Sequence, residues 1–156
     1  MKNFSRRQFI GASSSAFAFQ FLPSRVWGAN ERINVAGIGV GGKGTADVAS
    51  AANAGANIVA LCDVDTVRGA KSIKTFSKAK IYSDFREMLD KQKDVDAVTI
   101  SAPDHIHAVA ATAAMDLGKH IYCQKPLTHS IHEARVLTEA AAKNKLVTQM
   151  GNQAHS

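Results

Sequence analysis

The stretch Gly37-Ile38-Gly39-Val40-Gly41-Gly42 decides the fold of this chain. It contains the pattern G-x-G-x-x-G at positions 37, 39 and 42, after an apolar run over 32–38 and before an Ala-rich run over 42–54. Such glycines allow a tight turn, a close approach of the backbone to a pyrophosphate, and close packing of a helix on a strand. The helix N-terminus adds free N–H groups that attract phosphates. The stretch therefore predicts a dinucleotide-binding strand–turn–helix unit.

An acidic residue follows at the end of the next apolar run. Asp63 closes the run over 57–62, where a carboxylate can bind both hydroxyls of a ribose. This favours NAD, because a carboxylate repels the 2′-phosphate of NADP, although Arg68 and Lys71 lie near enough to leave NADP open. A structural alternative makes Asp63 the N-cap of the following helix, and Asp65 is better placed for that role.

Short apolar runs alternate with segments of helical spacing along the rest of the chain. Strands are predicted over 32–38, 57–62, 81–82, 95–100, 120–123 and 146–150, with helices over 42–54, 66–76, 84–89, 106–117 and 131–143. Expected helix signals are a cap at Ser83, a capping box from Ser130 to Glu133, and terminal glycines at Gly55 and Gly118. Strands joined by such helices pair in parallel. The predicted fold class is α/β, a doubly wound Rossmann sheet over 29–150.

Composition and charge limit the class of protein. The chain has 156 residues, 46% of them hydrophobic and 21% charged, which suits one globular domain. Outside the first 28 residues, 15 basic residues face 13 acidic ones with no basic block, so nucleic-acid binding is not expected. Cys62 and Cys123 lie about 60 positions apart without a zinc-site spacing. Buried free thiols are expected, and a disulfide stays open.

The N-terminus has the pattern of an export signal. Ser5-Arg6-Arg7-Gln8-Phe9-Ile10 precedes an uncharged run over 11–22, which has the length of a signal-peptide core and is short for a membrane span. Pro23 ends the run, and Val26-Trp27-Gly28 offers a cleavage point. The segment resembles a twin-arginine signal. We expect residues 1–28 to be removed and the protein to be periplasmic or exported, without a stable membrane span; an uncleaved anchor is the alternative.

The segments after the fourth and fifth predicted strands are more specific. Ser101-Ala102-Pro103-Asp104-His105-Ile106-His107 follows the fourth strand, and Gly118-Lys119-His120-Ile121-Tyr122-Cys123-Gln124-Lys125-Pro126-Leu127 spans the fifth. They resemble the strand-Pro-x-x-x-His and Gly-Lys-His-x-x-x-Glu-Lys-Pro-Leu patterns of the Gfo/Idh/MocA oxidoreductase family. Gln149-Met150-Gly151-Asn152-Gln153 resembles the turn into that family's second domain. The resemblance covers about residues 31–156.

The resemblance implies roles for the residues of these segments. Lys125 would be the catalytic residue, near the nicotinamide and the substrate hydroxyl. Other positions would contact or order the cofactor, namely Ser101, Ala102, Pro103, His107, Gln124 and Lys125 itself, together with the glycine loop and Asp63. His107 would order its loop rather than take part in the chemistry. Gln124 stands where the family usually has Glu, so this position adds no negative charge beside Lys125, and whether this tunes catalysis or marks a changed reaction stays open.

The resemblance also implies a reaction and partners. It implies hydride transfer between NAD and a hydroxyl-bearing carbon of a sugar or cyclitol, by a homo-oligomer when full length. The family's second α+β domain is missing from this chain, and residues 151–156 would begin the linker into it, so activity of this piece alone stays open. Alternatives are an exported NAD-dependent glycosidase-type enzyme that uses transient oxidation, and a non-catalytic nucleotide-binding protein. No metal site is expected, although His105, His107 and His120 lie close together in the sequence.

Overall fold

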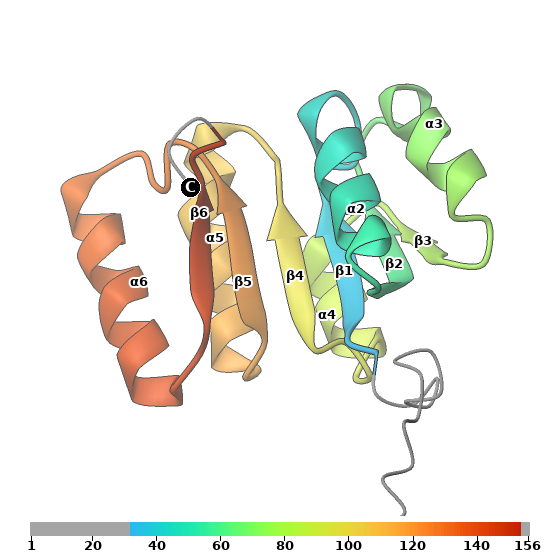
Figure 1. Cartoon of the computed structure of the whole chain (residues 1–156). Coiled ribbons are helices and arrows are strands. Elements are labelled where there is room, and N and C mark those ends of the chain that lie inside the picture. The colour runs from blue at the N-terminus through green and yellow to red at the C-terminus, as the bar shows by residue number, and fades with distance from the viewer. Residues whose placement is uncertain (1–31, 154–156) are drawn as a thin grey trace, which may run out of the picture. The chain divides into compact units, whose positions relative to one another are not determined.

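The computed structural model describes residues 32–153, which form a sheet covered by helices (Figure 1). The predicted signal peptide over 1–28 lies outside the described residues, as do the last residues of the predicted linker. The elements in chain order are β1 (Asn34–Ile38), α2 (Lys43–Asn53), β2 (Asn57–Cys62), α3 (Thr66–Thr75), β3 (Lys80–Tyr82), α4 (Phe85–Lys91), β4 (Ala97–Ile100), α5 (Asp104–Asp116), β5 (His120–Gln124), α6 (Ile131–Asn144) and β6 (Thr148–Gly151).

The sheet has six strands in the order β3-β2-β1-β4-β5-β6, and every neighbouring pair is parallel. The chain winds outward from β1 to β3, returns to β4 beside β1, and winds outward again to β6. This order confirms the doubly wound Rossmann fold. The winding reverses between β1 and β4, and ligands of such sheets bind outside the carboxyl ends of the strands at this switch point.

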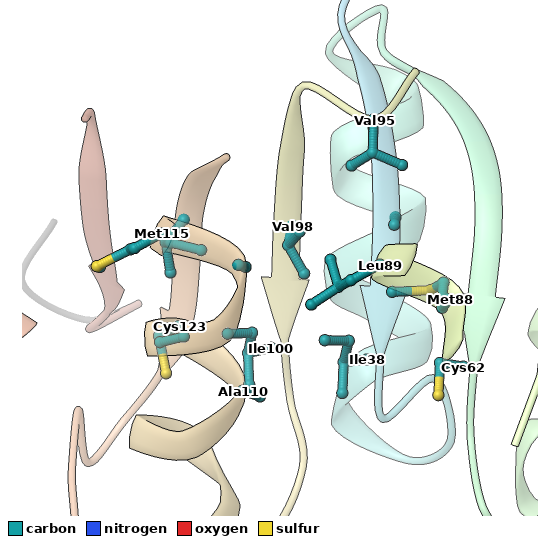
Figure 2. Close-up of a cluster of buried hydrophobic side chains, with 14 of the residues drawn as sticks. Ile38, Cys62, Met88, Leu89, Val95, Val98, Ile100, Ala110, Met115 and Cys123 are labelled. Atoms are coloured by element: carbon teal, nitrogen blue, oxygen red, sulfur yellow. The ribbon is translucent and has the colours of Figure 1, made fainter. Parts of the chain in front are cut away.

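The two faces of the sheet carry separate hydrophobic clusters. The larger cluster joins the strands to α4, α5 and α6, with Ile38, Met88 and Ile100 among its buried side chains (Figure 2). The smaller one lies under α2 and α3 and contains Val40, Val48, Leu61 and Ala79. The alternation of side chains along each strand serves both faces at once. The sheet is therefore buried on both sides, and its carboxyl edge is left for binding.

Both cysteines belong to the larger cluster. Cys62 ends β2 and Cys123 lies on β5, and each is a buried free thiol. This confirms the expectation of buried free thiols, and Cys62 and Cys123 do not form the disulfide that the sequence left open.

Helix ends follow local capping chemistry, with one correction. The capping box of Ser130 and Glu133 is present, and Asp65 caps α3 as predicted. The predicted cap of α4 at Ser83 is wrong: the N-cap is Asp84, whose carboxylate accepts a hydrogen bond from the Arg86 N–H at 2.8 Å. The carboxylate reaches the free N–H groups of the first turn, so the helix begins one residue later than expected.

Other boundaries shift by one to three residues. α5 begins at Asp104, directly after Pro103, rather than at 106. A proline suits the position before the first turn because it lacks an N–H that would need a partner. β4 begins at Ala97 rather than 95, and β6 runs over Thr148–Gly151 rather than 146–150. Between residues 32 and 153, none of the helices combines the length and apolar character needed to cross a bilayer.

Candidate nucleotide-binding site

A cleft of about 750 Å³ lies at the carboxyl ends of β1, β2 and β4. Six of the predicted site residues line it: Gly39, Gly41, Asp63, Ser101, Ala102 and Pro103. Lys43, Val64, Arg68 and His105 add to its walls without having been predicted as site residues. The other predicted site residues do not line this cleft, namely Gly37, Val40, Gly42, His107, Gln124 and Lys125.

Gly39 is the point of closest approach between the glycine loop and β4. Its φ is +73°, and an added Cβ would lie 2.7 Å from backbone atoms of Ser101 and Ala102. The same residue donates its N–H to the Cys62 carbonyl oxygen at 2.8 Å. A side chain at position 39 would therefore push the loop away from the strand ends and block the floor of the cleft.

The tight contact between α2 and β1 occurs at Gly37, where an added Cβ would lie 2.8 Å from the Val48 side chain. The sequence assigned it to Gly42, but an added Cβ there would meet only the far end of the Arg68 side chain, at 3.7 Å. At Gly44, an added Cβ would come within 1.7 Å of the Gly39 carbonyl oxygen. Gly44 thus lets α2 pack against the loop, whereas Gly42 supplies the turn, with a φ of +54°.

Asp63 ties the end of β2 to the glycine loop. Its Oδ2 accepts hydrogen bonds from the Val40 and Gly41 N–H groups, both at 2.9 Å, and its Oδ1 accepts one from the Asp65 N–H. Asp65 itself accepts the N–H groups of the first turn of α3. Asp63 is therefore not the helix cap, and its half-buried carboxylate lines the cleft at the height of the loop.

The start of α2 faces the same space. Its N-cap is Gly42, which has no side chain to accept a hydrogen bond, and the first turn carries no acidic residue. The Gly44 and Thr45 N–H groups donate to the backbone carbonyl oxygens of Gly41 and Gly42, and no acid neutralises the partial positive charge of this helix end. A glycine cradle, a positive helix end and a carboxylate at the end of the neighbouring strand are the parts that a dinucleotide needs for its pyrophosphate and its adenosine ribose, so the residues fit NAD.

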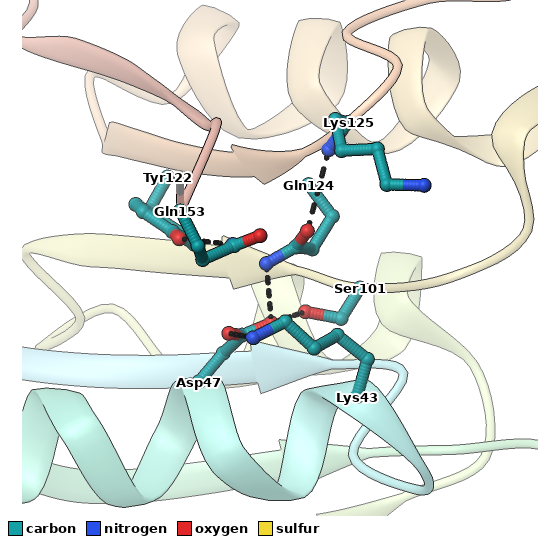
Figure 3. A network of polar contacts seen from close by, with 7 residues as sticks. All are labelled: Lys43, Asp47, Ser101, Tyr122, Gln124, Lys125 and Gln153. Carbon is teal, nitrogen blue, oxygen red and sulfur yellow. Dashed lines mark hydrogen bonds and ion pairs between the residues drawn. The ribbon is translucent and has the colours of Figure 1, made fainter. Parts of the chain in front are cut away.

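A buried carboxylate joins the end of β4 to the end of β5. Asp47, on α2, accepts hydrogen bonds from Ser101 Oγ at 2.7 Å and Gln124 Nε2 at 2.9 Å, and its other oxygen lies 3.1 Å from Lys43 Nζ (Figure 3). Sequence reasoning missed this residue. The only signal was weak: an acid four positions after Lys43 in an Ala-rich helix.

His107 lies in the first turn of α5, and Lys125 directly follows β5. The buried His107 ring places Nδ1 2.7 Å from the Pro126 carbonyl oxygen and Nε2 2.8 Å from that of Ala102. His107 thus holds the loop after β4 against the loop after β5. Lys125 is exposed, its side chain points away from Gln124 in Figure 3, and it forms no ion pair with any residue of the described segment.

The histidines of this region do not converge. His107 is engaged as described, His105 lines the cleft, and His120 accepts the Val147 N–H at 3.1 Å on the far strand β5. Over residues 32–153, no three His, Cys, Asp or Glu side chains are grouped as metal ligands would be.

Comparison with known proteins identifies the family to which this domain belongs. Residues 32–152 match the Gfo/Idh/MocA model, described as an oxidoreductase family with an NAD-binding Rossmann fold. The chain belongs to this family. The matched segment is the NAD-binding Rossmann domain of a Gfo/Idh/MocA protein, and its cleft lies at the switch point, where ligands of such sheets bind.

Curated relatives of this Gfo/Idh/MocA domain include dehydrogenases of cyclitols and sugars. Inositol 2-dehydrogenase of Salmonella typhimurium is 32% identical over 118 residues, which cover 73% of this chain and 35% of the relative. Levoglucosan dehydrogenase of Pseudarthrobacter phenanthrenivorans is 35% identical over 87 residues, or 56% of this chain and 22% of the relative. The chain spans about a third of the length of the first of these and less of the second.

Solved structures agree on the fold. An NAD binding oxidoreductase from Klebsiella pneumoniae superposes with a TM-score of 0.69 at 30% identity, over 77% of this chain and 34% of that one. A myo-inositol 2-dehydrogenase from Lactobacillus plantarum gives a TM-score of 0.71 at 24% identity, over 78% of this chain and 36% of that one.

Proposed function

We propose that this chain is the NAD-binding part of a dehydrogenase that transfers hydride between nicotinamide and a hydroxyl-bearing carbon of a sugar or cyclitol. The observation that carries the proposal is the cleft between the glycine loop, Asp63 and the end of β4, at the switch point of the sheet. The dehydrogenases of inositol and levoglucosan among the relatives support this substrate class.

The residues of the chain would divide the binding of the dinucleotide. The glycine loop and the start of α2 would hold the pyrophosphate, and Asp63 the hydroxyls of the adenosine ribose. Ser101, Ala102 and Pro103 would line the wall toward the nicotinamide, because they follow β4 across the switch point. When bound, NAD supplies the hydride acceptor or donor, and the protein supplies placement and proton handling.

Asp63 also bears on the choice between NAD and NADP. Its carboxylate lies in the cleft, bonded to the backbone of the glycine loop, where a 2′-phosphate would meet a negative charge. Arg68 lines the same cleft and could offset part of this repulsion. We expect NAD to bind more tightly than NADP, and we expect Asp63→Ala to narrow the difference.

Lys125 is the candidate proton-handling residue. It follows directly on β5, and its exposed ammonium is engaged by no acid among the described residues. As an ammonium, Lys125 could stabilise the alkoxide that forms as a substrate hydroxyl is oxidised, and as a neutral amine it could accept the hydroxyl proton. A second domain, as the longer relatives have room for, would complete the substrate site and the homo-oligomer.

The route out of the cytoplasm is part of the same proposal. The paired arginines and the uncharged run over 11–22 support twin-arginine export of the folded protein to the periplasm. Export after folding is suited to a protein that acquires a cytosolic dinucleotide, because the loaded domain would leave the cell intact.

The test uses the full-length natural protein and the variant Lys125→Met. NAD binding is measured by calorimetry, and oxidation of myo-inositol, levoglucosan and related sugars by NADH absorbance. We expect Lys125→Met to lower kcat by about 10²- to 10⁴-fold with little change in the Kd for NAD. Lys143→Met, which alters an exposed lysine on α6, should leave both unchanged.

Three results would count against the dehydrogenase. Absence of NAD binding would overturn the whole proposal. Glycoside cleavage without net NADH would favour transient oxidation during hydrolysis. Tight binding without turnover of any sugar or cyclitol would favour a nucleotide-binding role without catalysis.

A further inference from the structure

Asp47 is a buried acid outside the set of residues assigned to NAD. Its side chain is 5% exposed, and it lies on α2 facing the ends of β4 and β5 (Figure 3). Burying a carboxylate is costly unless hydrogen bonds and an opposite charge compensate for the lost hydration. The arrangement of its partners shows how the cost is met.

Among the described residues, each hydrogen bond or ion pair of the Asp47 carboxylate is with a donor. Oδ2 accepts from Ser101 Oγ and from Gln124 Nε2, and Oδ1 faces the ammonium of Lys43, whose side chain is half exposed. An ionised carboxylate only accepts hydrogen bonds, so all three partners suit its charged form. The network thus joins a carboxylate, an ammonium and two neutral donors at the junction of α2, β4 and β5.

The chemistry of this junction requires an amide at position 124. Gln124 is buried, and its Nε2 lies 2.9 Å from Asp47 Oδ2, while its Oε1 faces the Lys125 N–H at the long distance of 3.4 Å. A glutamate in the same place would bring a second carboxylate oxygen to Asp47 with no proton between them. Two carboxylates so close repel each other unless one binds a proton.

Gly151, on β6, confines the amide from the other side. An added Cβ at this position would lie 2.8 Å from Gln124 Nε2 and 2.9 Å from its Cδ. Tyr122, on the same strand as Gln124, is equally close at its hydroxyl, which accepts a hydrogen bond from Gln153 Nε2 at 3.0 Å. The Gln124 amide therefore has one place to lie, between Gly151 and Asp47.

We propose that Asp47 is a positioning residue for Lys125, acting through the amide of Gln124. By fixing Gln124 against α2 and the end of β4, the buried carboxylate sets the direction in which the chain leaves β5 and so where Lys125 stands. Gln124 is then the matched partner of Asp47 rather than a weakened acid. The negative charge that position 124 lacks is supplied from α2. The inference rests on the role proposed above for Lys125.

The test is a charge swap in the full-length protein. Gln124→Glu and Asp47→Asn should each lower kcat for the oxidised sugar or cyclitol by about 10- to 100-fold, the loss typical of a misplaced catalytic group. The Kd for NAD should change much less. The double variant Asp47→Asn/Gln124→Glu should recover most of the loss, because the amide introduced at position 47 can donate a hydrogen bond to the carboxylate introduced at position 124.

A second readout does not depend on turnover. Hydrogen–deuterium exchange of the segment 124–127 should be faster in each single variant and should return toward the natural rate in the double variant. Asn53→Asp and Asp116→Asn make the same chemical changes at exposed ends of α2 and α5, and they should alter neither exchange nor kcat.

Gly151→Ala tests the same contact without a change of charge. It should push the Gln124 amide off Asp47 and reproduce the loss of kcat, which keeps the proposal testable if Gln124→Glu does not fold. Folded single variants with unchanged kcat and exchange would overturn the proposal, as would a double variant that shows the full product of both losses. A failure of Lys125→Met to lower kcat would instead overturn the role of Lys125. Hydrogen–deuterium exchange would then decide by itself whether Asp47 and Gln124 fix the position of the segment 124–127.

Discussion

At the scale of single residues, the environments of the two buried cysteines, Cys62 and Cys123, change the pKa of their thiols. Burial raises the pKa of each thiol to about 12, and the negative charges of Asp84, Asp63 and Glu87 add to the effect at Cys62. The thiolate is the reactive form of cysteine, so a raised pKa suppresses reactivity at neutral pH. Cys62 also borders the nucleotide cleft, which makes its protonation state relevant to reagents that enter there.

We predict that neither thiol of the folded protein reacts with iodoacetamide at pH 7.5 on a time scale in which both react after unfolding. Between the unfolded pKa of about 9 and the folded value of about 12, the folded state binds more protons than the unfolded state. Stability should therefore fall as the pH rises through that range. Mass spectrometry counts the adducts, and rapid labelling of native Cys62 would contradict the prediction.

The sequence identified site residues only where their signal was local. The glycine loop and Asp63 form a pattern along the chain, and the structure brings them together in one cleft. Asp47 meets Ser101 and Gln124 across 54 and 77 positions. No spacing rule links such positions, because the contact exists only after β4 has paired with β1 and β5 with β4.

At the scale of helices and strands, a helix cap was likewise predicted correctly only where its signal is local in the sequence. The box of Ser130 and Glu133 was predicted because both partners of the reciprocal bond are visible in the sequence. At α4, Ser83 and Asp84 are both residues that can cap a helix, and the sequence analysis predicted Ser83 where the structure has Asp84. The choice follows from Asp84 and Arg86, which are hydrogen bonded and ion paired, with the pKa of Asp84 lowered to about 2 by this guanidinium.

We predict that Ser130→Ala lowers the free energy of unfolding by about 1 kcal/mol. The Ser130 hydroxyl accepts the Glu133 N–H, and alanine leaves that donor without its partner. For a domain of this size the melting temperature should fall by about 3–6 °C. Thermal unfolding measures the change, with Ser130→Thr as the control that keeps the cap. An equal loss in both variants would show that the hydroxyl is not responsible.

At the scale of the whole described molecule, the common direction of the strands decides where the site lies. Alternating apolar and helical segments predicted parallel strands, and the order β3-β2-β1-β4-β5-β6 places every carboxyl end at one edge of the sheet. The cleft and the Asp47 network lie at this edge. The sequence could predict the class of fold because periodicity is local, while the volume and walls of the cleft depend on loops that meet only in the folded chain.

We predict that NAD stabilises the whole domain. At a free concentration about 100 times the Kd, binding to the folded state alone contributes about 2.7 kcal/mol. Calorimetry should show a higher melting temperature with NAD and a smaller shift with equal NADP. Gly39→Ala, which forces a Cβ onto Ser101 and Ala102, should lower the melting temperature without ligand and abolish the shift. A full NAD shift in that variant would place the binding site elsewhere.

The turns at the opposite edge of the sheet offer a practical handle. Gly55 and Gly118 end α2 and α5 there, both with positive φ, and an added Cβ at either would meet no atom within 4 Å. A short peptide tag or dye attachment loop inserted beside either turn would project away from the strands' carboxyl ends. A domain immobilised through such an insertion would present its cleft to the solution, which is the orientation that a surface-bound optical sensor for dinucleotides needs.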